Sequence, residues 1–195
     1  MNDILVRPGL LGDLDVINSI YNHYVCHTHV TFDIEPWSMT KRLDWFSKFD
    51  GKGYQLWVAE VDGKVQAFAY TGQFRAKAAY NSSAEVTIYG HHQLPIKDVG
   101  NSTGLEEGLS KGLGKGLSKG LEEGLGKGLG KALYNKLLAN LAEFGIHRLY
   151  AVIALPNNIS MGLHQQLGFK QVAILDEVGS KFGKMISVAM LEKRL

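Results

Sequence analysis

The sequence has a single cysteine, no long hydrophobic run and almost no excess of charge, and each shortage excludes a class of protein. A lone Cys26 cannot form an internal disulfide, so a fold held together by disulfides is excluded. No run of about 18 apolar residues is present, so no segment could span a bilayer as a helix. The first residues carry no apolar signal core, and we therefore expect a cytoplasmic protein.

Lysine and arginine together number 21 against 19 aspartate and glutamate residues, which gives a formal charge of only +2. This balance lacks the basic excess of a polyanion-binding protein, so we expect neither a nucleic-acid partner nor a membrane partner. Hydrophobic residues make up 45% and charged residues 21% of the 195 positions, which is typical of a soluble globular chain. The length fits one domain, and we predict a single domain over residues 1–195.

Hydrophobic periodicity predicts strands that alternate with helices. The expected strands are Ile4–Val6, two runs joined by a tight turn at Asp62–Gly63, Ser83–Gly90, His147–Leu155, Lys170–Val178 and Lys184–Leu191. The expected helices are Leu14–Tyr24, a helix capped by Ser38 that ends near Gly51, Lys131–Phe144 with Gly145 as its C-cap, and a short helix from Asn157 or Asn158 to Gly168. This order favours an α/β or α+β fold in which helices pack on the faces of one sheet.

The strand "SAEVTIYG" carries an acidic residue among apolar ones. Side chains alternate along a strand, so Glu85, Thr87 and Tyr89 are expected on one face, with Val86 and Ile88 on the other. Glu85 is thus placed on a strand, and burial near the sheet would raise the pKa of its carboxyl group.

Four segments resemble the GNAT family of acyl-coenzyme A N-acetyltransferases: "AEVTIYG", "GKGLGKALYNKLL", "YAVIALPNN" and "SMGLHQQLGF". Three others, "IYNHYVCHTHVTFDIEP", "WVAEVDGKVQAFAYTGQFRAKAAY" and "VGSKFGKMISVAML", are similar to the branch that acetylates phosphinothricin or methionine sulfoximine. The resemblance covers nearly the whole chain except about 94–125. It implies a mixed, splayed sheet flanked by helices, a homodimer, and acetyl transfer from acetyl-CoA to the amino group of a small amino-acid analogue.

The resemblance implies a cofactor site around a glycine-rich turn. A turn of small residues lets backbone N–H groups approach a pyrophosphate, and the helix that follows adds positive potential. By resemblance, the residues that bind acetyl-CoA are Ile88, Tyr89, Gly126, Lys127, Gly128, Leu129, Gly130, Lys131 and Asn157. Leu125 stands where the family has Gln or Arg, so that contact is missing or comes from Lys127 or Lys131. The glycines could instead belong only to the repeat, and Asn157 could be only a helix cap.

Two residues are candidates for proton transfer. An ammonium has no lone pair, so amine acetylation needs a base, and Glu85 matches the strand carboxylate that the branch uses in this way. Glu85 could instead bind the substrate ammonium or pair with a lysine. His164 lies where many family members carry a tyrosine that protonates the leaving thiolate. It could equally be a helix histidine satisfied by local polar groups, or a contact to the cofactor.

The acceptor site is expected to contain cations, because substrates of this branch carry carboxylate and phosphinate or sulfoximine groups. Arg75, Lys77 and Tyr80 in "FRAKAAY" match the family's substrate-binding segment, and Phe32 in "THVTFDIEP" would form a wall of the pocket. The first three could instead belong to a solvated loop end.

The histidines raise the question of a metal. His23, His27 and His29 are close in sequence, and so are His91 and His92, but no carboxylate or cysteine completes either set at ligand spacing. We therefore predict no metal.

Residues 104–131 consist of seven tetrads that each begin Gly-Leu, whereas the family has a short loop at this point. We predict a low-complexity insertion over 94–125, before the cofactor-binding helix. Its glycines disfavour a helix, although a four-residue repeat would place the leucines on one slowly drifting stripe.

Three interpretations of the repeat stay open. It could be an expansion whose last copy still binds acetyl-CoA, an insertion that weakens this binding, or a striped helix that binds a partner. The last two would make the chain a catalytically impaired GNAT scaffold that binds CoA or oligomerises.

Overall fold

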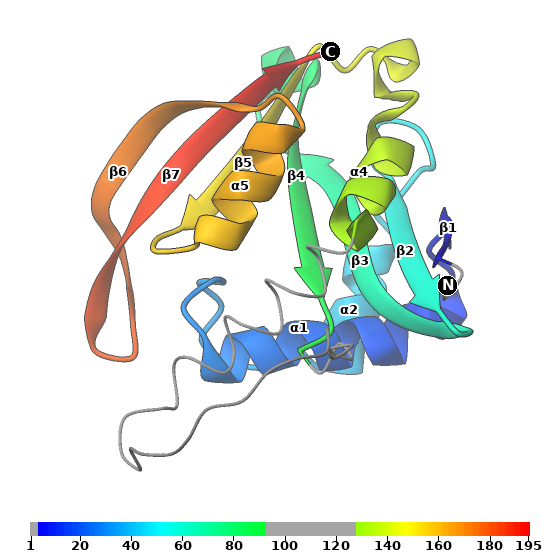
Figure 1. Cartoon of the computed structure of the whole chain (residues 1–195), viewed down its shortest axis with the longest axis horizontal. Helices are drawn as coiled ribbons and strands as arrows, with labels where there is room; N and C mark the ends of the chain where they lie inside the picture. Colours follow the sequence, from blue (N-terminus) through cyan, green and yellow to red (C-terminus); the bar gives the residue numbers. More distant parts are fainter. Residues whose placement is uncertain (1–3, 93–127) are drawn as a thin grey trace, which may run out of the picture.

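The computed structural model describes residues 4–92 and 128–195, and within these ranges seven strands form one sheet in the order β1-β2-β3-β4-β5-β7-β6 (Figure 1). The strands are β1 Ile4–Pro8, β2 Leu56–Val61, β3 Lys64–Gln73, β4 Ser83–Gly90, β5 Arg148–Ala154, β6 Lys170–Lys181 and β7 Lys184–Arg194. The helices are α1 Leu14–His27, α2 Met39–Phe46, α4 Gly130–Leu138 and α5 Asn158–Gln166. Strands β4 and β5 are parallel and the other neighbours antiparallel, so the predicted mixed sheet is confirmed.

The turn and capping residues predicted from the sequence lie at the ends of helices and strands, as expected. Asp62 and Gly63 adopt φ values of 52° and 72° in the turn between β2 and β3. The Ser38 hydroxyl oxygen accepts a hydrogen bond of 3.3 Å from the Lys41 backbone N–H and caps α2. Gly145 has φ 82° and closes the segment that follows α4. The predicted order of strands and helices is confirmed.

Two helices end earlier than predicted. The segment expected to be helical over 131–144 leaves the helical conformation at Asn140 (φ −120°), so α4 ends at Leu138 and a separate 3₁₀ turn spans Leu141–Phe144. This break lets Leu141 reach 0% exposure in the core. Helix α2 ends at Phe46 instead of near Gly51.

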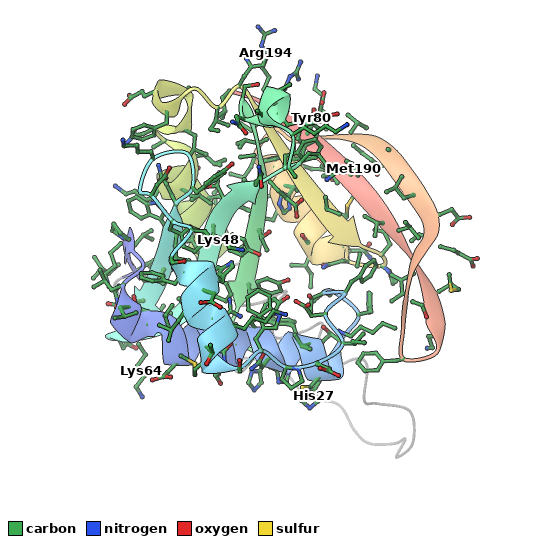
Figure 2. The ribbon with its side chains drawn as sticks, turned by 180° about the vertical axis from the view of Figure 1, so that it is seen from behind. His27, Lys48, Lys64, Tyr80, Met190 and Arg194 are labelled. Carbon is green, nitrogen blue, oxygen red and sulfur yellow. The ribbon has the colours of Figure 1, made fainter. Side chains whose placement is uncertain are left out.

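The sheet separates two hydrophobic clusters, one on each face. Helices α1 and α2 cover one face, which is turned toward the viewer in Figure 2, and α4 packs on the other face over β2 and β3. Beneath α4 the strands present three small side chains, Ala59, Ala67 and Ala69, each with 0% exposure, and Trp57 and Val61 pack at the margin of the same cluster. On the opposite face the same strands present larger residues, including Val58 and Phe68. The alanines therefore allow α4 to lie close to the sheet.

Strands β4 and β5 pair over only three residues. Ser83, Ala84 and Glu85 face Arg148, Leu149 and Tyr150, and no pairing follows, although β4 continues to Gly90 and β5 to Ala154. Figure 1 shows the two strands diverging beyond this point. The predicted splayed sheet is therefore confirmed, and it opens directly after Glu85. None of the described helices is long and apolar enough to cross a membrane.

A larger residue in the alanine layer should displace α4. Ala69→Leu adds three carbon atoms at a position with 0% exposure, and we expect the free energy of unfolding to fall by about 1 to 3 kcal/mol, measured by urea denaturation. Lys64→Leu, at the exposed start of the same strand, is the control and should change stability little. Equal stability of Ala69→Leu and the parent chain would contradict this close packing.

Candidate active site

Glu85 is the last residue of β4 that pairs with β5, where it lies opposite Tyr150, and on its other side it pairs with Gly72 of β3. Its neighbours Ala84 and Val86 belong to the cluster under α4, so the Glu85 side chain projects to the face covered by α1 and α2. Among the described residues no hydrogen bond to its carboxylate is formed. The sequence predicted that Glu85 and Val86 lie on opposite faces of the strand, and the structure agrees, whereas the helices that cover each face and the end of pairing with β5 were not predicted.

The electrostatic surroundings of Glu85 favour a carboxyl group that accepts protons. Burial raises the pKa of Glu85 above its usual value, and the nearby Arg75 guanidinium opposes this shift in part. The side chain is half-buried, and no hydrogen-bond donor among the described residues stabilises its charged form. Such a carboxylate is a better base than an exposed one, because its proton affinity lies closer to that of an amine.

Arg75 is held beside an aromatic pair at the end of β3. Its Nη1 donates a 2.8 Å hydrogen bond to the Phe74 carbonyl, and its guanidinium lies 4.4 Å from the centre of the Phe74 ring. Phe74 in turn stacks on Tyr150 of β5, with ring centres 4.1 Å apart. This stack joins β3 to β5 and keeps Arg75 within electrostatic range of Glu85.

The other predicted acceptor contacts lie farther out. Lys77 is exposed, and Tyr80 is 44% exposed at the end of the sheet opposite His27 (Figure 2). Phe32, in the loop between α1 and α2, is 41% exposed and packs so closely on Gly179 of β6 that a methyl group there would collide with its ring. Of these four residues, Arg75 is the one whose charge acts on the pKa of Glu85.

The β6–β7 hairpin is tied to the loop that carries Phe32. Lys181 is 4% exposed, and its Nζ donates a 2.8 Å hydrogen bond to the Thr31 carbonyl. Burial lowers the pKa of Lys181, and Asp33 opposes this shift. The sequence alone gave no indication of this contact, since the two residues are 150 positions apart.

The predicted cofactor turn is described from Gly128 onward, and Gly126 and Lys127 lie outside the described residues, as does the predicted insertion over 94–125. Gly128 has φ 89°, a conformation that favours glycine, and a Cβ there would meet no atom within 4 Å. Leu129 and Gly130 are buried while Lys131 is exposed. Helix α4 has no side-chain cap among the described residues, and Leu129 before it is already helical, with φ −59° and ψ −49°.

The strand residues predicted to bind the cofactor lie beyond the last β4–β5 pair. Ile88 and Tyr89 pair with Ala69 and Phe68 of β3 on one side only, so their other backbone edge has no partner in β5. Tyr89 packs its ring on Tyr21, with ring centres 5.2 Å apart. Backbone groups that have no partner in β5 are suited to hydrogen bonding with an extended ligand.

Asn157 is the N-cap of α5, and Leu155 and Pro156 separate it from β5. Its side-chain oxygen accepts a 3.1 Å hydrogen bond from the Ser160 backbone N–H. The helix-cap interpretation of Asn157 is therefore observed, and the contact to acetyl-CoA stays a prediction.

His164, on α5, has both ring nitrogens hydrogen-bonded. Nδ1 lies 2.7 Å from the Ser160 carbonyl oxygen, and Nε2 lies 3.0 Å from the Tyr134 hydroxyl of α4. A carbonyl can only accept, so Nδ1 carries the proton and Nε2 of the neutral ring accepts the Tyr134 proton. Burial lowers the pKa of His164, which is 2% exposed, and favours this neutral form. Of the interpretations of His164, these contacts match satisfaction by local polar groups.

Sequence reasoning missed Tyr134. Tyr134 shares the buried face of α4 with Leu133 and Leu137, and this helical spacing was the available signal. A tyrosine at such a position buries a hydroxyl group that needs a hydrogen-bond partner. The partner could not be identified, because it lies on another helix 30 residues away.

The histidines of α1 and of the segment after β4 form a stack. The His23 ring lies 3.7 Å from that of His92 and 4.6 Å from that of His27, measured between centres. Among the described residues, no three histidine, cysteine, aspartate or glutamate side chains are arranged to hold a metal ion.

The sequence is similar to a known protein family and to individual acetyltransferases. The sequence pattern of the Acetyltransferase (GNAT) family matches residues 121–169. The chain is 36% identical over 197 residues to a phosphinothricin N-acetyltransferase of Streptomyces coelicolor, covering 99% of this chain and 97% of that protein. It is 28% identical to an L-methionine sulfoximine/L-methionine sulfone acetyltransferase of Salmonella typhimurium, covering 97% and 94%.

A solved structure shows the same arrangement. The crystal structure of a GNAT superfamily phosphinothricin acetyltransferase from Sinorhizobium meliloti in complex with acetyl-CoA matches with a TM-score of 0.78 and 27% identity, covering 98% of this chain and 88% of that one. The sheet that opens after Glu85 and these similarities lead to one conclusion: the chain belongs to the GNAT acetyltransferase family.

Proposed function

We propose that the chain is a cytoplasmic, homodimeric N-acetyltransferase that moves the acetyl group of acetyl-CoA to the α-amino group of a small amino-acid analogue of the phosphinothricin or methionine sulfoximine type. The observation that carries the proposal is Glu85, a half-buried carboxylate with a raised pKa, at the position where β4 and β5 separate. The relatives named for these two acceptors support the substrate class.

The proposed chemistry begins with the acceptor. Its ammonium group transfers a proton to a carboxylate oxygen of Glu85, directly or through water, and so frees the nitrogen lone pair. Acetyl-CoA supplies an activated acetyl group as a thioester. A C–N bond forms, the nitrogen loses its second proton and the C–S bond breaks. The products are the acetylated amine, the CoA thiol and one released proton, so each ammonium proton is accounted for.

The residues that would hold acetyl-CoA come from three elements. The turn at Gly128 and the N–H groups at the start of α4 would receive the pyrophosphate. The unpaired edge of β4 at Ile88 and Tyr89, with Asn157 across the opening, would bind the pantetheine arm. Gly126 and Lys127 stay predicted contacts outside the described residues.

The residues around Glu85 and on α5 have proposed roles in acceptor binding and proton transfer. Arg75 would bind an acidic group of the acceptor, with Lys77, Tyr80 and Phe32 as the outer contacts expected from the sequence. The acid role of His164 stays a prediction, and its occupied ring nitrogens support the helix-contact interpretation instead. The thiolate then takes its proton from water.

Replacing the base should change both rate and pH dependence. We expect Glu85→Gln to lower kcat/KM at pH 8 at least about 100-fold, because general base catalysis contributes this much or more. In the parent chain kcat/KM should fall as the pH drops through the raised pKa of Glu85, since protonation removes the base. The measurement is acetylation of phosphinothricin and of methionine sulfoximine between pH 5 and 9, with calorimetric titration of acetyl-CoA as the binding control. Full activity of Glu85→Gln would assign the base elsewhere, and no acetyl-CoA binding by the parent chain would overturn the proposed function.

The charge of Arg75 should set the working pH of Glu85. Arg75→Gln removes the guanidinium that opposes the raised pKa of Glu85, so the acidic limb of the pH–rate curve should move to higher pH. Arg75→Lys, which keeps the charge, is the matched control and should leave the limb near its parent position. An unchanged limb in Arg75→Gln would show that Arg75 does not influence the base.

The edge of the sheet supports the proposed homodimer. Among the described strands β6 lies at the edge of the sheet, and it exposes Val172 (49%), Ile174 (55%) and Val178 (55%). We expect Ile174→Lys to shift the chain from dimer to monomer in sedimentation velocity, because it places a charge in an apolar contact. Leu11→Lys, at another exposed apolar residue (61%), should leave the dimer intact. A monomeric parent chain would contradict the proposal.

A further inference from the structure

One buried pair of side chains joins the two helices that begin at the proposed cofactor site. Tyr134 stands four residues after Gly130, about one turn or 6 Å into α4. His164 stands seven residues after Asn157, about two turns or 10 Å into α5. The Tyr134 hydroxyl and His164 Nε2 are 3.0 Å apart. The pair is therefore close to both of the helix starts that would bind acetyl-CoA.

The contact is directional and has no substitute nearby. Tyr134 is 0% exposed and His164 2% exposed, so water cannot replace either partner. The Ser160 carbonyl fixes the proton on His164 Nδ1, which leaves Nε2 as the acceptor for the tyrosine proton. Loss of one partner would leave the other buried and without its hydrogen bond.

Other contacts between α4 and α5 are of a different kind. Within the described residues no second side-chain hydrogen bond joins them, and they otherwise share the apolar cluster that contains Leu133, Leu137 and Leu167. Apolar contacts are non-directional and allow small shifts of one helix along the other. A hydrogen bond with fixed donor and acceptor allows much less movement.

We propose that the Tyr134–His164 pair sets the position of the first turn of α4 relative to Asn157, so that both ends of one acetyl-CoA molecule find their binding groups in place. The inference rests on the proposed function, because it assigns these helix starts to one ligand. Tyr134 is a positioning residue: it touches His164, and it acts on binding by fixing the spacing in advance, which lowers the cost of ordering the site.

The test compares acetyl-CoA binding and acceptor kinetics in the intact chain. Tyr134→Phe keeps the buried ring and removes only the hydroxyl, and we expect its Kd for acetyl-CoA to rise by up to about tenfold, the effect of one buried hydrogen bond. The KM for the acceptor at saturating acetyl-CoA should stay unchanged. A rise in acceptor KM of the same size would indicate a general loosening of the chain and would overturn the proposal.

A double-mutant cycle tests whether the two residues act as a unit. His164→Leu should weaken acetyl-CoA binding, and Tyr134→Phe should add little in that background, because the hydrogen bond is already lost. His164→Gln offers the Tyr134 hydroxyl a new acceptor and should bind acetyl-CoA more tightly than His164→Leu. If Tyr134→Phe does not fold, the comparison of His164→Gln with His164→Leu tests the proposal alone. Additive effects of Tyr134→Phe and His164→Leu on the Kd for acetyl-CoA would overturn the proposal.

The control is a variant that lowers the stability of the chain and leaves the Tyr134–His164 hydrogen bond intact. Val65→Ala removes buried methyl groups from the α1 and α2 face of β3 and should leave the Kd for acetyl-CoA at the parent value. Parent-like binding by Tyr134→Phe, or equal weakening by Val65→Ala, would overturn the inference and leave the proposed function standing. Absence of binding and turnover in the parent chain would overturn the proposed function itself, and the inference with it.

Discussion

The parting of β4 and β5 after three paired residues is the constraint on which the rest of this structure depends. Parallel strands that stayed paired would satisfy each other's backbone groups and leave no edge for a ligand. Because they separate directly after Glu85, the carboxylate and the edge at Ile88 and Tyr89 that has no partner in β5 lie at one opening. The stack of Phe74 on Tyr150 is a side-chain contact between β3 and β5 at the paired end.

The polar groups around this opening divide into those with partners and those without. His164 and Tyr134 are buried and satisfy each other, which is the usual state of polar groups in a core. Glu85 is half-buried with no hydrogen bond among the described residues, and only the charge of Arg75 offsets the cost. A half-buried carboxylate without a hydrogen-bond donor is more consistent with a catalytic role than with a structural one. A structural carboxylate would be stabilised by a donor.

Much of the fold could be predicted from local patterns. The hairpin at Asp62–Gly63 followed from residues that tolerate positive φ, and the Ser38 cap followed from its hydroxyl. The end of α4 could not be predicted, because "KLLANLAEFG" is a good helical sequence to its last residue. The chain leaves the helix at Asn140 since Leu141 is then buried completely, and this gain depends on residues far away in the sequence. The contact of Lys181 with Thr31 was beyond prediction for the same reason.

The sequence by itself determined the order of the elements, the face of β4 on which Glu85 stands and the family resemblance, because periodicity, turn residues and motifs are local properties of the chain. Only the tertiary structure decided where β4 and β5 separate, that Arg75 rather than Lys77 or Tyr80 acts on Glu85, and that the proton of Tyr134 points to His164. These are distances between residues on different elements. Such distances follow from how the helices and strands pack, and packing is a property of the whole core.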